Sequence, residues 1–341
     1  MIKRIQSRPQ WQRVIIFSLL IVVIIVVVFF ITLGVAYLGV NAGPRSKSIA
    51  IQDGVSVREW ATLPGDDAYP AALTIDSSGN IYTGSYVTGS VWRITPQGVV
   101  TELPQTRDTF GAVVGLVWGD EALYVLDRNS PLAAASMTLW RWQEGSAPEK
   151  LHESNDTDRF PYDLDRDAEG NLYVSFVFAD TSSVITRYPI EGDAEVWWTA
   201  PDKTLITGIA YHAEKDELIA VDTQNSDLYA IPLANPAESY LLYTHTLDPV
   251  PGFGDATAAP DGTIYLASLD INRVAALSPE HELTYLAGAF RGSSRVAYDA
   301  TRRRLYVNNF DNRSLLADQV LFVQVDVTPK LPFALDVIEW K

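Results

Sequence analysis

Apolar positions follow two different patterns along the chain. Residues 14–40 form a run of 27 positions without a charge, whereas the sequence after residue 55 consists of short apolar runs separated by turn residues. A continuous apolar run predicts a membrane-spanning helix, because about 20 residues cross a bilayer. Short runs rich in β-branched and aromatic residues, broken by Gly, Asp, Asn and Pro, predict strands. We therefore expect one helix followed by an all-β body.

The β-rich part repeats one phrase six times. Each copy has an apolar strand, a turn, a second strand that is often centred on Tyr, and a third strand. The copies begin at residues 73, 116, 164, 209, 256 and 296. Third strands are expected from residues 91, 139, 184, 228, 274 and 320, and fourth strands from residues 99, 194, 240 and 283. Four strands per unit at this period predict a six-bladed β-propeller of four-stranded blades over residues 55–341.

Closure of the ring requires a strand from one end of the chain, because an open first or last blade would expose a sheet edge. Residues 55–63 resemble a fourth strand that has no blade of its own. We predict that they join the last blade and lock the ring. Residues 333–340 are a rival for the same place, or an extra flanking strand.

The apolar run is longer than the 7–15 residues of a signal-peptide core, which favours an uncleaved anchor. The alternative is cleavage just after the run, at residues 40–42. Four cations precede the run and favour a cytoplasmic N-terminus. We predict a cytoplasmic basic tail (1–13), a transmembrane helix (14–40), a linker (41–54) and an extracytoplasmic propeller at the cell membrane.

Charge and cysteine content exclude several functions. The net charge is −16, and all 42 acidic residues follow residue 47. A body this acidic repels nucleic acid, so no nucleic-acid partner is expected. The chain has no cysteine, which excludes disulfides, thiolate catalysis and Cys-ligated zinc. The four histidines form no spaced metal pair and no visible Ser/His/Asp set.

One register of the inner strands is expected to gather charged side chains at the mouth of the central channel. Equivalent positions of the six blades carry Ala72, Gly115, Asp163, Gly208, Asp255 and Arg295. Residues at one register point the same way, so Asp163, Asp255 and Arg295 should meet. The two carboxylates could hold a divalent cation such as Ca²⁺. Alternatively, Arg295 neutralises them in a purely structural cluster.

Neighbouring positions supply further candidates. Tyr162 and Thr207 directly precede this register and, with Arg295, are predicted ligand-binding residues. Asp222 follows the second strand of the fourth blade on the same face and is a catalytic candidate. Asp at such a position also forms turns through local hydrogen bonds, which is the structural alternative.

The repeat phrases LTIDSSGNIYTGS, LDRDAEGNLYVS and ITGIAYHAEKDELIAVD resemble six-bladed propellers of the SMP-30/gluconolactonase/LRE-like family and its strictosidine-synthase-like and paraoxonase-like relatives. The resemblance covers residues 55–330. A basic tail, one anchor and this propeller are similar in layout to adipocyte plasma membrane-associated protein. NHL-type binding propellers share the phrases, so the fold does not give the function.

In the lactonase branch the resemblance implies calcium held by a Glu, an Asn and an Asp. The Asp motif matches residues 252–255, which makes Asp255 a metal-ligand candidate. The expected Asn falls at Thr207, and the expected Glu falls in residues 69–71, which contain none. Asp163 could supply a second carboxylate from the third blade.

Two functions are therefore expected. The first is a membrane-anchored propeller that binds a small molecule, a glycan or another extracellular protein at the channel mouth without a metal. The alternative is a calcium-dependent lactonase or esterase-type hydrolase. In the alternative, calcium polarises the carbonyl while a carboxylate such as Asp163 or Asp222 activates water.

Overall fold

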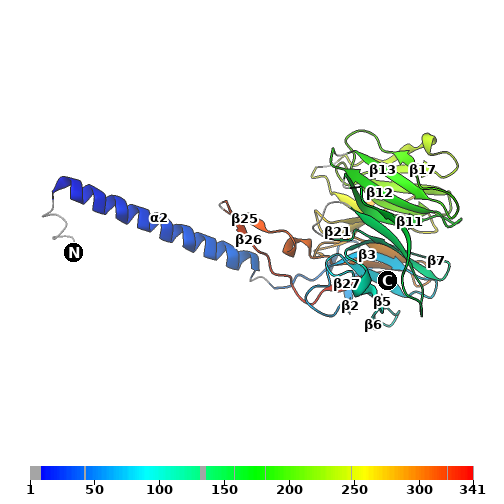
Figure 1. Ribbon diagram of the computed structural model, residues 1–341, viewed down its shortest axis with the longest axis horizontal. Coiled ribbons are helices and arrows are strands. Elements are labelled where there is room, and N and C mark those ends of the chain that lie inside the picture. Colours follow the sequence, from blue (N-terminus) through cyan, green and yellow to red (C-terminus); the bar gives the residue numbers. More distant parts are fainter. Residues whose placement is uncertain are drawn as a thin grey trace. The chain divides into compact units, whose positions relative to one another are not determined.

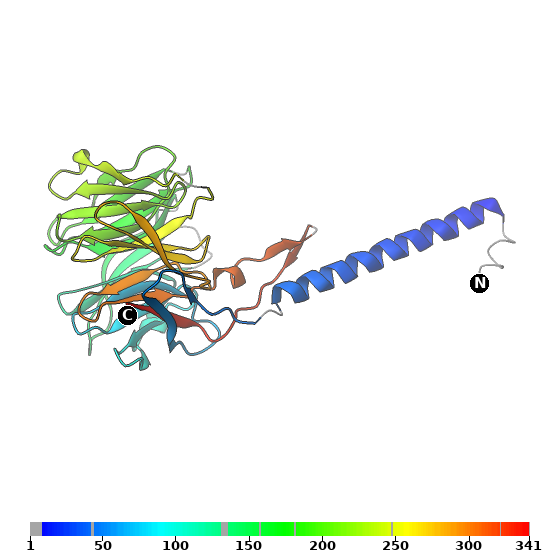
Figure 2. The same cartoon turned by 180° about the vertical axis from the view of Figure 1, so that it is seen from behind.

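The computed structural model describes residues 9–41, 44–130, 136–156, 158–180, 182–246, 248–320 and 322–340. Residues 1–8 of the predicted basic tail lie outside the described residues. Two compact units are present: Met1–Arg45 with Arg313–Lys330, and Ser46–Asn312 with Leu331–Lys341. Figures 1 and 2 show the second unit as an array of small twisted sheets.

The first unit contains the predicted helix, α2 (Gln10–Asn41). It is long and apolar enough to cross a membrane, and a signal sequence would meet the same test. Its 32 residues span about 48 Å at 1.5 Å per residue, more than the roughly 30 Å of a hydrocarbon core. The unit also holds η2 (Asn312–Ser314) and a hairpin of β25 (Asp318–Val320) and β26 (Val323–Val325).

The second unit is a six-bladed β-propeller, as the repeat predicted. Strands of the first three blades, from the innermost outward, are β3 (Pro70–Ile75), β4 (Ile81–Ser85), β5 (Val91–Ile94), β6 (Val100–Glu102); β7 (Val113–Gly119), β8 (Ala122–Asp127), β9 (Met137–Trp142), β10 (Glu149–Ser154); and β11 (Arg159–Arg166), β12 (Leu172–Phe178), β13 (Ser183–Tyr188), β14 (Glu195–Thr199). A short helix, α3 (Thr106–Thr109), links the first two blades.

The remaining strands, in the same order, are β15 (Ile206–His212), β16 (Glu217–Asp222), β17 (Asp227–Pro232), β18 (Tyr240–Tyr243); β19 (Phe253–Ala258), β20 (Ile264–Ser268), β21 (Arg273–Leu277), β22 (Leu283–Gly288); and β23 (Val296–Asp299), β24 (Arg304–Asn308), β27 (Ala334–Trp340), β2 (Val55–Thr62). β1 (Ile49–Ala50) adds a fifth strand to the fifth blade, and η1 (Pro236–Glu238) precedes β18.

The repeated phrase has a local physical cause. Asp76 ends the inner strand of the first blade, and its carboxylate accepts hydrogen bonds from the Asn80 backbone (2.8 Å), the Asn80 amide (2.8 Å) and the Tyr82 hydroxyl (3.1 Å). Asp167 makes the same three bonds in the third blade, at 2.8, 2.7 and 3.0 Å. Asp, Asn and Tyr at this spacing therefore build the turn between the first two strands of a blade.

The hydrophobic core lies between neighbouring blades. One buried cluster joins Tyr82 and Val91 of the first blade to Leu116, Val125 and Trp142 of the second. Gly84 shows how closely these blades approach, because a Cβ atom there would lie 2.3 Å from Val113 Cγ1. Trp92 and Trp142 are buried core residues, as the pattern predicted.

Both ends of the chain contribute to the last blade. Residues 55–62 form its outer strand, β2, and so close the ring as predicted. The third strand is wrong in the prediction: residues 320–325 belong to the β25–β26 hairpin, and β27 pairs with β24 instead. The two proposed rivals therefore occupy adjacent places in one sheet. The long, regular β27 offers seven residues for pairing, whereas β26 has only three.

Candidate functional site

A β-bulge precedes the predicted charged register in five of the six blades. The strand pairing shifts between Pro70 and Ala72, and at the equivalent point of the next four inner strands. The extra residues are Ala71, Val114, Tyr162, Thr207 and Gly254. A bulged residue leaves the ladder, which frees its carbonyl group from strand pairing. We call this end of the propeller the channel mouth.

Arg295 uses these free carbonyl groups. Its Nε donates to Ala71 O (3.2 Å), and its Nη2 donates to Val114 O (3.0 Å) and Tyr162 O. The side chain therefore starts on the sixth blade and reaches the inner strands of the first three. It is buried, with 10% of the side chain exposed.

Asp163 and Asp255 complete what we call the mouth cluster with Arg295. Arg295 Nη1 lies 3.0 Å from Asp255 Oδ1, and Nη2 lies 3.4 Å from Asp163 Oδ1. Both carboxylates also bridge to the next blade through backbone amides. Val296 N donates to Asp255 Oδ2 and Ile209 N donates to Asp163 Oδ2, each at 2.8 Å. The sequence prediction that these three side chains meet is thus matched by the geometry.

Burial changes the protonation of this cluster. It raises the pKa of Asp255 to about 8, although the charge of Arg295 opposes the shift. Burial also raises the pKa of Asp163 against the same opposition. Two carboxylates around one guanidinium would bury an uncompensated negative charge, and one bound proton removes it.

The residues at the mouth do not fit a calcium site. Calcium takes six to eight oxygen ligands, usually several of them carboxylates. No group of three or more His, Cys, Asp or Glu side chains suited to a metal occurs in the described part of the chain. The only two carboxylates of the mouth cluster already bind a guanidinium, whose positive charge occupies the place between them.

The other predicted residues lie at the same end of the propeller but outside the mouth cluster. Asp222 is fully buried, and its carboxylate accepts bonds from Leu205 N (2.8 Å), Gln224 N (3.0 Å) and the Asn225 amide (2.6 Å). It therefore holds a loop. Thr207 bonds the Thr223 hydroxyl and donates to Gly254 O at 3.2 Å. The Tyr162 side chain is 36% exposed.

Sequence analysis missed a second group at the mouth, the aromatic rim, made of Tyr86, Arg128, Phe160 and Phe310. Arg128 Nη1 donates to the Tyr86 hydroxyl (3.2 Å), and its guanidinium lies 5.2 Å from the Phe160 ring centroid. Tyr86 packs edge-on against Phe310 at 5.7 Å. All four are half-buried. Tyr86 and Arg128 each directly follow a second strand, and this shared position is the signal that could have found them.

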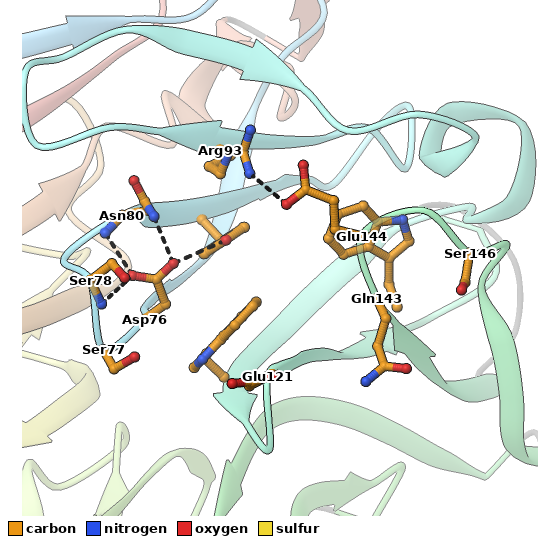
Figure 3. Close-up of a pocket in the computed structure, with 12 residues that line it drawn as sticks. Asp76, Ser77, Ser78, Asn80, Arg93, Glu121, Gln143, Glu144 and Ser146 are labelled. Atoms are coloured by element: carbon orange, nitrogen blue, oxygen red, sulfur yellow. Dashed lines mark hydrogen bonds and ion pairs between the residues drawn. The ribbon is translucent and has the colours of Figure 1, made fainter.

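A separate groove lies at the opposite ends of the first two blades (Figure 3). Its volume is about 530 Å³. The polar groups labelled in Figure 3 largely bond one another: Asp76 holds Ser78 and Asn80, and Arg93 pairs with Glu144 at 3.2 Å. Because Asp76 makes the repeated turn, we assign this groove to blade architecture.

Similar solved structures support the fold. The chain matches a luciferin-regenerating enzyme with a TM-score of 0.62 and 14% identity, over 84% of this chain and 95% of that one. It matches a gluconolactonase from Xanthomonas campestris (0.60, 12%, 87% and 95%) and the calcium-binding protein regucalcin from Agrobacterium tumefaciens (0.58, 13%, 83% and 96%). No family model and no curated protein matches the chain. The chain is therefore a six-bladed β-propeller that resembles SMP-30/gluconolactonase-type structures in fold.

Proposed function

We propose that this protein is a membrane-anchored, extracytoplasmic propeller that binds a small organic anion at the aromatic rim of the channel mouth and needs no metal. The observation that carries the proposal is the position of Arg295 between Asp163 and Asp255. A built-in cation there makes the pair of carboxylates part of the scaffold. The ligand is then expected above the mouth cluster, where polar and aromatic side chains reach solvent.

The chemistry of the rim supports an anionic ligand with an apolar part. Arg128 presents a planar set of donors that suits a carboxylate. Among the described residues its Nε atom has no hydrogen-bond partner. Phe160 and Tyr86 line the guanidinium, and exposed Tyr162 adds a further ring nearby in sequence. Ligand sites commonly combine such apolar walls with a few polar groups.

The location rests on helix α2. An uncleaved helix of this length, preceded by Lys3, Arg4 and Arg8, favours an N-terminus in the cytoplasm and a propeller outside. In that orientation the acidic propeller would meet extracytoplasmic ligands, including small molecules, glycans or proteins that carry acidic groups.

The test is a thermal-shift titration of the full chain in nanodiscs. Benzoate and phenylacetate are compared with benzamide and phenylacetamide, which lack the charge. We expect only the carboxylates to stabilise the protein, by about 2.7 kcal/mol at 100 times Kd. Arg128→Gln should remove the effect. Arg93→Gln, which alters a cation at the opposite end of the blades, should keep it. Equal stabilisation by the amides would refute an anion site.

The alternative remains the calcium-dependent lactonase or esterase, which the fold of the gluconolactonase neighbours favours. It is separated from our proposal by calorimetric titration of the same protein with Ca²⁺. We expect no binding heat. Micromolar binding that disappears in Asp255→Ala would instead support a metal at the mouth and would justify a screen of lactone and ester substrates.

A further inference from the structure

The sixth blade contains an insertion that its own sheet does not use. Residues 309–333 separate β24 from β27, although these two strands pair directly. Within the insertion lie η2 and the β25–β26 hairpin, which pairs from Asp318 with Val325 to Val320 with Val323. In the other blades this connection is shorter, so closure of a blade does not require it.

The hairpin ends in an exposed apolar tip. Phe322 is 102% exposed and has a φ of 68°, a backbone conformation that bulky residues rarely adopt. Leu316, just before the hairpin, is 63% exposed. Turns of this kind normally carry Asn or Gly, which are polar or free of a side chain. An aromatic residue here is unfavourable in water on both counts, so the tip is suited to an apolar environment.

The insertion also contacts the end of the apolar helix. Asn41, the last residue of α2, donates from Nδ2 to Asp326 O (3.0 Å) and accepts from Thr328 N at Oδ1 (2.6 Å). Lys330 Nζ donates to the Asn41 carbonyl. Helix and hairpin therefore belong to one compact unit. Asn41 is polar and follows the uncharged run, so it marks where the helix would leave the hydrocarbon core.

We propose that the hairpin tip is a second membrane contact, which inserts Phe322 into the lipid interface beside the end of α2. Residues 319–325 carry no charge and are flanked by Asp318 and Asp326. Four residues of strand separate Phe322 from Asp326, about 13 Å at 3.3 Å per residue. Interfacial segments bury their apolar face about 5–10 Å deep, so the tip can enter while both carboxylates stay hydrated. The inference rests on the anchoring part of the proposed function.

The lipid surface is favoured over a protein partner because the helix already fixes this segment at the bilayer. The contact would set the position of the sixth blade, and with it the propeller, above the membrane. A single anchor joined to a flexible linker would leave that position free.

The experiment uses the absence of cysteine in the chain. Single variants Phe322→Cys, Ile25→Cys and Ile190→Cys of the full chain are labelled with an environment-sensitive fluorophore in phosphatidylcholine vesicles. Ile25 lies inside α2 and reports the bilayer interior, whereas Ile190 is a 69% exposed propeller residue that reports water. Doxyl-labelled lipids then quench any label that touches acyl chains, and circular dichroism verifies that each variant is folded.

We expect the label at position 322 to emit at shorter wavelength than at position 190 and to be quenched by shallow more than by deep doxyl groups. A label at 322 that behaves as at 190, while 25 is quenched, overturns the hairpin inference and leaves the anchor intact. Lack of quenching at 25 overturns the anchor itself. A blue shift at 322 without lipid quenching shows that protein covers the tip, and this also overturns the proposal.

Discussion

Arg295 Nη1 lies 3.0 Å from Asp255 Oδ1, and this contact joins the sixth blade to the fifth at the channel mouth. The two residues are 40 positions apart in the chain. The same guanidinium reaches Asp163 and carbonyl groups of the first three blades. One side chain thus connects five of the six inner strands, and it gives the mouth a cation that belongs to the protein.

Loss of this cation should destabilise the fold strongly. Removing one partner of a buried ion pair typically costs 3–5 kcal/mol, because the remaining charge is buried without compensation. We expect about this loss of unfolding free energy for Arg295→Met in urea denaturation. Adding Asp255→Asn should restore part of it. Arg93→Met breaks an exposed pair with Glu144 and should cost at most about 1 kcal/mol. Equal effects of the two Arg variants would contradict the assignment.

The mouth cluster should also make stability depend on pH. The pKa of Asp255 is raised to about 8 in the folded protein, above its ordinary value of 3.8. The folded state therefore binds this proton more tightly than the unfolded state does. Its stabilising contribution is complete below about pH 4 and is lost as the pH rises through 8.

Asp255→Asn should flatten this dependence, because the amide cannot lose a proton. Urea unfolding at several values between pH 4 and pH 8 measures it, and each pKa unit corresponds to about 1.4 kcal/mol. Asp53→Asn, at an exposed position, is the control and should keep the slope of the unaltered protein. An unchanged slope in Asp255→Asn would assign the pH dependence to other carboxyl groups.

Close approach of the inner strands predicts an asymmetry between two mouth glycines. A Cβ atom on Gly208 would lie 2.6 Å from Gly254 O, so Gly208→Ala should destabilise the protein by about 1–3 kcal/mol. On Gly254 the nearest atom would be 3.7 Å away, and Gly254→Ala should be close to neutral. Thermal unfolding of both variants measures the difference. The reverse order would mean that the fourth and fifth blades do not pack as described.

The repeated turn predicts a small, equal effect at two distant sites. Tyr82→Phe and Tyr173→Phe each remove one hydrogen bond to the turn aspartate and should cost about 1 kcal/mol. Tyr124→Phe is the control, since the contact of Tyr124 with Arg166 is through its ring. Denaturation midpoints of the three variants test whether the hydroxyl groups carry the turn.

Ring closure by β2 predicts a sharp difference between two truncations. A fragment of residues 48–341 keeps β2, whereas residues 64–341 lack it and expose the edge of β27. An open edge of a long strand promotes association. We expect the first fragment to be monomeric in sedimentation analysis, and the second to aggregate or unfold at lower temperature. A monomeric and equally stable shorter fragment would contradict closure by β2.

The sequence by itself determined the helix, the blade repeat and the meeting of Asp163, Asp255 and Arg295. These features follow from local rules: apolar length, alternation along strands, and turn chemistry such as that of Asp76 with Asn80. A repeat also aligns equivalent positions, which is why a one-dimensional register predicted a three-dimensional cluster.

Only the tertiary structure decided the rest. Residues 320–325 favour a strand wherever they pair, and the competition with β27 was settled by the partner edge and not by propensity. Tyr86 and Phe310 meet because the ring closes, which no local pattern encodes. The choice between a metal pair and an ion pair at the mouth depended on the reach of one Arg295 side chain across the channel. Such contacts depend on how the ends of the chain come together, which is a property of the closed ring alone.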